Sequence, residues 1–412
     1  MGCRAMERAG MIGENDVIIV GGGMVGLSLA VALGQAGLTV AVIDREDPAR
    51  VVGAAFDGRT SAIADASVRM LEAIGLWRHV DEAQPIHDIR VSDGASPLFL
   101  HYDHRDLGDR PFGQMVENRV FRQALQARLT ELPGIRLLAP MAVAGVERGP
   151  GRVTARLGDG TMLIASLCIA ADGRFSALRE AAGIGTTAWD YDQAGIVCTV
   201  THERPHEGVA QERFLPAGPF AILPMTGNRS SLVWTERKDL APAMLALDDA
   251  GFDAEIARRF GDHLGAVHAV GPRWSYPLAL HLAERYVDHR LVLVGDAAHG
   301  IHPIAGQGLN LGLRDVAALA EVLVESARVG LDLGQADVLA RYERWRRFDT
   351  VLLAGVTDAL NRLFSNDIAP VQLARDLGLA TVNKLPPLKR FLMRHAMGGV
   401  GDLPRLLRGE AL

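Results

Sequence analysis

The chain has 412 residues, 49% of them hydrophobic, and a formal net charge of −6 at pH 7. A chain of this length can bury a substantial core and is expected to form two lobes, while its acidic balance excludes the broad basic field of a nucleic-acid-binding protein. Its three cysteines are odd in number and have no metal-ligand spacing, so we expect no metal site, no disulfide framework and a reducing, cytoplasmic compartment.

The N-terminal region combines the elements of a dinucleotide-binding unit. An apolar, β-branched run at Val17–Val20 predicts a buried strand, and Leu27–Gln35 predicts a helix. A second apolar strand ends in Asp44, an acid about 20 residues beyond the glycines that can bond a ribose hydroxyl. Between the first strand and the helix stands the motif G-x-G-x-x-G, whose glycines are Gly21, Gly23 and Gly26. Such glycines let the backbone approach a pyrophosphate closely, so the region predicts a dinucleotide site in preference to a plain glycine-rich turn.

A second motif occurs in the middle of the chain. The apolar run Leu167–Ala171 predicts a short strand, and the pattern D-G-x-x-S-x-x-R follows it, from Asp172 to Arg179. Ser176 and Arg179 are three residues apart, so we expect them on one face of the helix that the motif opens. By itself the pattern equally fits an Asp-Gly turn with a helix cap.

The third motif lies near residue 300. The run Leu291–Val294 predicts a buried strand that delivers Asp296 into a loop rich in proline and glycine, which ends at a helix start near Asn310. An acid at a strand end can hold polyol hydroxyls, and glycines before a helix let backbone N–H groups point at an anionic ligand oxygen. These features suit the ribityl chain and pyrimidine ring of a flavin, although an ordinary strand–loop–helix unit gives the same pattern.

Together the three motifs resemble the class A flavoprotein monooxygenases, which share the fold of para-hydroxybenzoate hydroxylase. The resemblance implies an α/β fold with a Rossmann-like FAD-binding domain, an inserted α+β substrate domain containing a β-sheet, and a C-terminal helical segment. It places the first glycine motif and Asp44 at the ADP part of FAD, Asp172 and Arg179 at the border of the dinucleotide, and Gly295 and Asp296 at the ribityl chain. Family members more often have glutamate at the position of Asp44.

The implied domains are discontinuous in sequence. The FAD-binding domain would comprise residues 17–90, 112–187 and 286–330, and the substrate domain would comprise residues 91–111 and 188–285. Residues 335–412 would form the C-terminal helical region.

A narrower resemblance is to the ubiquinone-biosynthesis hydroxylases. It is carried by His302–Asp315, Phe214–Pro224, Ser231–Thr235, Arg59–Ile63 and Val116–Asn118. It implies hydroxylation of the aromatic ring of a polyprenylated phenol, with Arg59 near the FAD pyrophosphate and Asn118 as a dinucleotide contact. As alternatives, Arg59 caps or solvates a helix start, and Asn118 only begins the predicted helix Arg119–Leu132.

The resemblance also implies the mechanism. NADH or NADPH would reduce tightly bound FAD, and O2 would then give a flavin C4a-hydroperoxide whose distal oxygen is attacked by the phenol ring. Pro303 would lie beside the isoalloxazine in a positioning role, and loop amides would stabilise charge at N1/C2=O. These amides belong to Gly306, Gly308, Leu309 and Asn310. His299 and His302 have the chemistry of bases, but a loop-orienting role is the favoured interpretation, so no general base is assigned.

Other functions on this fold remain alternatives. They are a hydroxylase of a soluble aromatic compound, a prenyl reductase, a halogenase and a non-catalytic prenyl-binding protein. The halogenase element W-x-W-x-I-P is absent from the sequence. No stretch reaches the roughly 18 apolar residues of a membrane span. Basic and apolar residues alternate in 385–412, which predicts peripheral contact with the inner face of the membrane, or with other quinone-biosynthesis proteins, as alternatives to a solvated helix.

Overall fold

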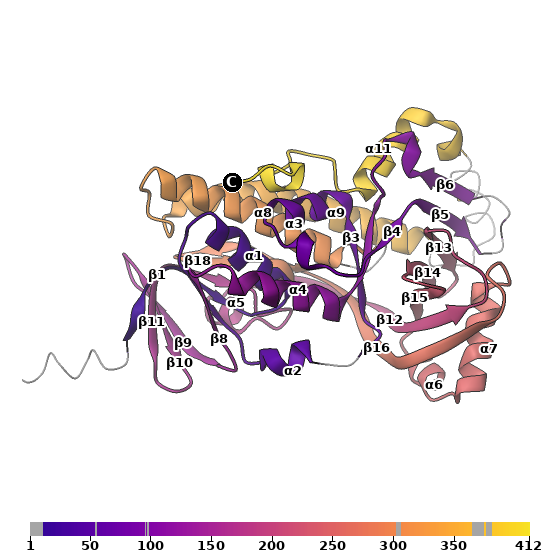
Figure 1. Cartoon of the computed structure of the whole chain (residues 1–412), viewed down its shortest axis with the longest axis horizontal. Helices are drawn as coiled ribbons and strands as arrows, with labels where there is room; N and C mark the ends of the chain where they lie inside the picture. The colour runs from indigo at the N-terminus through magenta and orange to yellow at the C-terminus, as the bar shows by residue number, and fades with distance from the viewer. Residues whose placement is uncertain are drawn as a thin grey trace, which may run out of the picture.

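The computed structural model describes residues 11–53, 56–94, 96, 99–301, 306–364, 375 and 381–412. Side chains are described in the same ranges except at 11–13, 51, 52 and 360. Figure 1 shows two sheets at opposite ends of the molecule, with long helices extending along both of them.

The first sheet has eight strands, and its central strands are parallel. The order is β17-β18-β11-β1-β2-β8, with β10 and β9 attached to β11. The strands are β1 (Met11–Val20), β2 (Val40–Ile43), β8 (Ile135–Leu138), β9 (Val143–Arg148), β10 (Val153–Leu157), β11 (Met162–Ala170), β17 (Val287–Asp288) and β18 (Leu291–Leu293). The central strands are buried on both faces, as expected for apolar parallel strands between helices.

The register aligns the carboxyl ends of the central strands. Val20 pairs with Ile43 on one side and with Ala170 on the other, and Ala170 pairs with Leu293. The three sequence motifs begin directly after these residues, so they meet at one edge of the sheet. Ligands of open α/β sheets bind at this edge.

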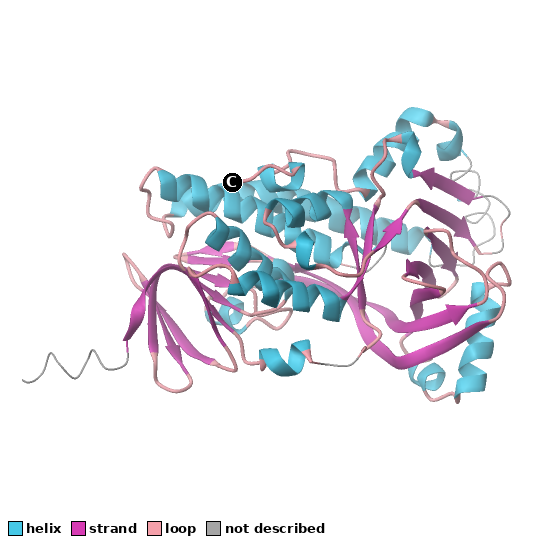
Figure 2. Ribbon diagram, viewed as in Figure 1, coloured by secondary structure: helices cyan, strands magenta, loops and turns pink. Residues whose placement is uncertain are grey.

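Helices cover the first sheet and the region between the sheets (Figure 2). They are α1 (Met24–Gln35), α2 (Pro48–Val52), α3 (Asp65–Ala73), α4 (Asn118–Thr130), α5 (Ala177–Ala181), α8 (Gln307–Arg328) and α9 (Ala336–Phe364). Short 3-10 turns occur at η1 (Trp77–His79), η2 (His104–Asp106) and η3 (Gly295–Ala297). The buried residues of α1 and α8 join the sheet strands in the largest hydrophobic cluster.

The second sheet also has eight strands and is largely antiparallel. Its order is β19-β16-β12-β15-β14-β13-β5-β6. The strands are β5 (Asp88–Asp93), β6 (Phe99–Asp103), β12 (Thr186–His202), β13 (Val209–Leu215), β14 (Gly218–Met225), β15 (Arg229–Arg237), β16 (Val267–Ala283) and β19 (His299–Gly300). Apolar side chains of this sheet pack against α6 (Ala241–Leu245) and α7 (Asp249–Phe260) in a cluster that contains Trp234 and Phe252.

A small sheet of β3 (Thr60–Ala64), β7 (Gly113–Glu117) and β4 (Gln84–Ile86), in the order β3-β7-β4, completes the fold. The α/β class with an additional strand-rich part is thereby confirmed. The domain boundaries stay a prediction. Strands β5 and β12 each begin just before a predicted boundary and end after it, and β19 comes from the segment 286–330 but pairs with β16 in the second sheet.

The C-terminal region contains α11 (Pro386–Ala396) and the 3-10 turn η5 (Arg405–Arg408). Leu406 and Leu407 are buried in the largest cluster, and Met393 is buried beside Phe364 in a third cluster. Much of the apolar part of 385–412 therefore faces inward. Within the described ranges, no helix is both long enough and apolar enough to cross a membrane.

Candidate functional site

The first glycine motif forms a turn that only glycine permits. Gly21 has φ +112°, and a Cβ atom there would collide with the carbonyl of Ala171. A Cβ atom on Gly26 would collide in turn with the carbonyl of Gly21. Gly23 instead faces open space at the N-cap of α1, so two glycines allow close packing and the third leaves the helix start accessible.

Asp44 folds back onto this turn. Its Oδ2 accepts a hydrogen bond from the backbone N–H of Gly22, and its Oδ1 accepts one from Glu46 N at 2.7 Å. A carboxylate oxygen has a second lone pair, so both oxygens can still receive a ribose hydroxyl. The predicted acid thus lies directly beside the glycine turn.

The D-G-x-x-S-x-x-R segment connects the first motif to the third. Ser176 is the N-cap of α5, and its hydroxyl accepts from Arg179 N at 3.0 Å. Ser176 therefore precedes the helix and caps it, whereas we expected Ser176 and Arg179 to lie on one face of that helix. The Arg179 guanidinium donates to Ala297 O at 2.8 Å and to Arg174 O at 2.9 Å. Asp172 Oδ1 is buried and has no hydrogen-bond partner among the described residues.

The third motif packs against the first. Gly295 has φ +58°, and Val25 lies where Cβ atoms on Gly295 and Gly312 would project. Asp296 is exposed, and no described residue hydrogen-bonds to its carboxylate or forms an ion pair with it. The carboxylate borders a cavity of about 210 Å³ that Arg174 and Tyr276 also line. An accessible, unpaired carboxylate at a strand end is suited to hold polyol hydroxyls.

The start of α8 supplies backbone donors. Gly306 adopts a left-handed conformation with φ 63° at the N-cap, and α8 continues for 22 residues. The first four N–H groups of such a helix have no intrahelical acceptor and carry the positive end of the helix dipole. Gly308 lies in the first turn, with open space where a side chain would be, and Leu309 packs partly against the largest cluster. Pro303 and His302 lie outside the described residues.

The side chain of Asn310 is hydrogen-bonded within the protein. Its Oδ1 accepts from Ala64 N at 2.8 Å, and its Nδ2 donates to Ala62 O at 2.8 Å and to Gly306 O at 3.2 Å. These bonds clamp strand β3 to the start of α8. Because the side-chain amide of Asn310 is occupied, only its backbone N–H can contact a flavin, as the sequence predicts.

Arg59 and Asn118 lie together at one end of the pairing between β3 and β7, where Asn118 N donates to Arg59 O at 3.0 Å. Arg59 is paired with Asp57 at 2.6 Å and stacks over Trp274 at 5.6 Å, and its side chain is 47% exposed. It precedes strand β3, so the alternative that it caps a helix start does not apply. Asn118 is the first residue of α4, as the alternative held, and its Oδ1 accepts from Ser61 Oγ at 2.7 Å.

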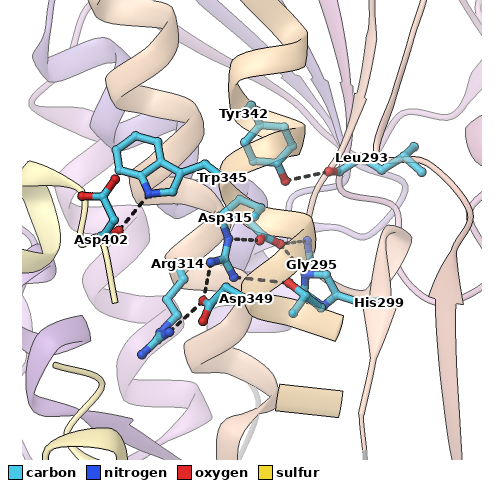
Figure 3. A network of polar contacts seen from close by, with 11 residues as sticks. Leu293, Gly295, His299, Arg314, Asp315, Tyr342, Trp345, Asp349 and Asp402 are labelled. Carbon is cyan, nitrogen blue, oxygen red and sulfur yellow. Dashed lines mark hydrogen bonds and ion pairs between the residues drawn. The ribbon is translucent and has the colours of Figure 1, made fainter. Parts of the chain in front are cut away.

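A buried polar network lies beneath the third motif (Figure 3). Asp315 Oδ2 accepts from Gly295 N at 2.9 Å and from His299 Nε2 at 2.6 Å, and its Oδ1 accepts from Arg346 Nε at 2.8 Å. Asp349 bridges the two arginines of the network, at 2.6 Å from Arg346 and 2.8 Å from Arg314. His299 is therefore buried as a partner of Asp315, which fits the loop-orienting interpretation.

Electrostatics explains why the network stays charged. Burial opposes ionisation of Asp315, but the neighbouring His299 and Arg346 hold the pKa of this carboxyl below its usual value. Burial likewise opposes ionisation of Asp349, and Arg314 and Arg346 lower the pKa of Asp349. The sequence analysis did not single out this network, because Arg346 is separated from the motif by most of α8 and the following turn.

His281 is a second residue that the sequence analysis missed. It lines the cavity, and its Nε2 donates to the backbone carbonyl of Asp296 at 2.8 Å. Burial, followed by the positive charges of Arg174 and Arg179, lowers the pKa of His281 despite this hydrogen bond. His281 is therefore a neutral imidazole at neutral pH that supports the backbone of Asp296.

One edge of the sheet thus offers two helix N-termini and the carboxylates of Asp44 and Asp296, with a cavity beside the second. The open space at Gly23 and Gly308 leaves the starts of both helices accessible along this edge. The residues present therefore fit a pyrophosphate at α1 and a polar ring system at α8.

Comparison with known proteins identifies this arrangement. The sequence pattern of the family described as FAD binding domain matches residues 14–349. The chain belongs to this FAD-binding family. FAD is accordingly its cofactor, and the match spans all three motifs.

Members and neighbours of the family are similar over nearly the whole chain. The chain is 59% identical to ubiquinone hydroxylase UbiL of Rhodospirillum rubrum, over 96% of this chain and 93% of that protein. It is 37% identical to 3-demethoxyubiquinol 3-hydroxylase of Escherichia coli, over 93% and 98% of the two chains. The crystal structure of p-nitrophenol 4-monooxygenase PnpA from Pseudomonas putida has the same fold, with a TM-score of 0.78 at 22% identity over 95% and 100% of the chains. The resemblance to class A flavoprotein monooxygenases and ubiquinone-biosynthesis hydroxylases is thereby confirmed.

Proposed function

We propose that the chain is an FAD-dependent monooxygenase that hydroxylates the aromatic ring of a polyprenylated phenol in ubiquinone biosynthesis, with O2 and a reduced nicotinamide as co-substrates. The observation that carries this proposal is the 59% identity to a ubiquinone hydroxylase over 96% of the chain. All three flavin motifs are present in the chain, which supports catalysis over simple binding of a prenyl group.

We assign the roles along the cofactor as follows. The glycine turn with Gly21, Gly23 and Gly26 holds the pyrophosphate, and Asp44 holds the adenosine ribose. Asp172 and Arg179 border the dinucleotide, while Arg59 and Asn118 approach it from the β3–β7 side. Asp296 holds the ribityl hydroxyls.

Bound FAD supplies the redox chemistry that lets O2 hydroxylate the ring. The chain's own contribution is binding, orientation and charge stabilisation. The N-terminal amides of α8 face the pyrimidine side, where their positive dipole favours negative charge. Asp315 fixes the backbone of Gly295 beneath this site, and Tyr276 and His281 line the cavity beside Asp296. Pro303 positions the flavin, and no side chain is assigned as a general base.

The reductant is NADH or NADPH and binds transiently. The chain has no second G-x-G-x-x-G unit that would form a separate nicotinamide domain. The resemblance to class A monooxygenases implies that the donor instead reaches the flavin across the same lobe.

The proposal is tested by deleting the gene in its native organism and profiling quinones. We expect ubiquinone to fall and a prenylated phenol to accumulate, and the parent gene, but not an Asp296→Ala version, to restore the profile. Normal ubiquinone without an accumulated precursor would contradict the proposal and would favour a soluble aromatic substrate. Purified protein should also show the yellow absorbance of bound flavin.

A further inference from the structure

The outward face of α9 is apolar, which is unusual for a helix at a protein surface. Its exposed large side chains are Phe348 (76%), Val351 (49%), Leu352 (54%), Val356 (44%) and Leu363 (46%). Together with the exposed Gly355 and Ala359 they follow one another every three or four residues, as pairs or single positions, and so lie on one stripe of the helix. We call these five residues, with Gly355 and Ala359 between them, the α9 stripe; at 1.5 Å per residue it is ~22 Å long.

The exposed charged residues of α9 around the α9 stripe are all arginines, and the acids of this stretch are only partly exposed. Between positions 341 and 363, every exposed residue that the structure describes is apolar, a glycine or an arginine. The arginines are Arg341, Arg344 and Arg347 at one end and Arg362 at the other. Arg341 pairs with Glu325 and Arg362 with Asp358, whereas no described residue forms an ion pair with Arg344 or Arg347. This local basic surface stands out on a chain with a net charge of −6.

The neighbouring helix α11 has the same composition on its exposed positions. Leu388 and Phe391 are exposed on α11 together with Arg390 and Arg394, and Lys384 and Leu385 are exposed directly before the helix. The sequence from 381 to 401 contains no acidic residue. Met393 on the other side of α11 is buried in one cluster with Phe364 of α9, so both helices border the same hydrophobic cluster.

We infer that the α9 stripe, with the exposed part of α11, docks the protein on the surface of an anionic lipid bilayer. Apolar side chains bordered by arginines are the pattern of helices that lie in the membrane interface, where the side chains enter the acyl region and the arginines meet lipid phosphates. A second copy of the chain is the poorer occupant, because the same stripe would bring exposed arginines to face these arginines, while Asp349 and Asp358 already pair with arginines of their own chain.

The position of the stripe supports this occupant. At its C-terminal end, Asn361 Nδ2 donates to Gln193 Oε1 on β12 at 3.0 Å, and Phe364 stacks on Phe214 of β13 at 4.1 Å. The stripe therefore ends at the sheet assigned to the substrate. This inference rests on the proposed function, since a polyprenylated substrate resides in a bilayer.

The test is flotation of the purified, FAD-loaded protein with vesicles of phosphatidylcholine alone or with added phosphatidylglycerol. We expect binding to the anionic vesicles. The double substitution Phe348→Asp with Leu352→Asp should reduce partitioning about tenfold, since it places two carboxylates in the interface. The matched control, Val329→Asp with Leu331→Asp, changes two exposed apolar residues outside α9 and should bind as the parent does. FAD content and circular dichroism report whether each variant is folded.

A parent protein that stays unbound with anionic vesicles would overturn the inference. Equal losses in the two double variants would overturn the assignment to α9. Light scattering provides the remaining outcome: a parent dimer that the α9 substitutions convert to a monomer, without vesicle binding, would identify a second copy as the occupant. No substrate is present in these measurements, so their failure is distinct from a failure of the proposed hydroxylation, which is read from quinone profiles.

Discussion

Replacing Asp315 by asparagine should destabilise the protein strongly. Three N–H donors converge on the two oxygens of Asp315, from Gly295, His299 and Arg346. Asparagine offers one acceptor oxygen and an NH2 group, so at least one of these donors would face another donor. The Arg346 side chain is only 5% exposed and would also lose its buried counter-charge.

The magnitude follows from this burial. Breaking a buried ion pair by removing one partner costs about 3–5 kcal/mol of unfolding free energy. An unfolding entropy of about 2.1 cal/mol/K per residue gives about 0.9 kcal/mol/K for 412 residues, so Tm should fall by about 3–6 °C. Because Gly295 N is also released beside Asp296, FAD affinity should fall about tenfold, which equals about 1.4 kcal/mol.

Asp349→Asn is the matched control. The Asp349 side chain is 30% exposed, Arg346 keeps Asp315, and Arg314 keeps its bond to Gly398 O at 3.0 Å. The Asp349→Asn variant should therefore lose less unfolding free energy, about 1 kcal/mol. Calorimetry of the protein with and without FAD, and titration of flavin fluorescence, measure both effects. An Asp315→Asn protein as stable as the parent, or less affected than Asp349→Asn, would refute the role given to this network.

Three other predictions follow from single sites. Asp296→Ala should lose FAD on dialysis while its Tm without FAD stays unchanged, because the carboxylate has no described protein partner; full retention of flavin would refute the ribityl assignment. Gly26→Ala should abolish the soluble fold, because a Cβ atom there collides with Gly21 O, whereas Gly23→Ala should fold and only bind FAD more weakly. Solubility and flavin content measure both effects, and equal behaviour of the two variants would contradict this prediction. Burial raises the pKa of Glu212 from 4.5 to about 7, so the folded state binds this proton more tightly and stability falls as pH rises through that window, by roughly 3 kcal/mol at most. Thermal unfolding between pH 5 and 8 should show that Glu212→Gln loses less stability with rising pH than the parent does. The same loss in both proteins would contradict the raised pKa of Glu212.

The parts of the site that could be predicted are local in sequence. A strand of β-branched residues, a glycine turn and an acid at the next strand end occupy consecutive segments, and each must lie at the carboxyl edge of a parallel sheet. The strands expected at Val17–Val20 and Leu291–Val294 are present as β1 and β18, although β1 starts earlier, at Met11. β1 extends because its first half pairs with β11, a partner far along the chain.

The parts that could not be predicted depend on pairs that are distant in sequence. The side-chain amide of Asn310 is hydrogen-bonded to strand β3, and only the folded structure shows that these side-chain atoms already have partners. A charged residue on a helix, such as Arg346, gives the same sequence pattern whether its side chain faces solvent or a buried partner. The sequence therefore does not predict the ion pair between Arg346 and Asp315. The C-terminal segment posed the same problem, because alternation of basic and apolar residues does not reveal that Leu406 and Leu407 face the core.

The two faces of α9 connect these observations. Its inner face carries Tyr342, which donates to Leu293 O at 2.9 Å, and Arg346, which holds Asp315 beneath the third motif. Its outer face carries the α9 stripe. A helix with its side chains is about 10 Å thick, so Asp315 and the Gly295 N–H that donates to it lie within about one helix diameter of the outer face of α9 at Arg346. The ion-pair network therefore has two structural roles. It holds the backbone of Gly295 in place, and it fixes α9, which carries the α9 stripe, relative to Gly295.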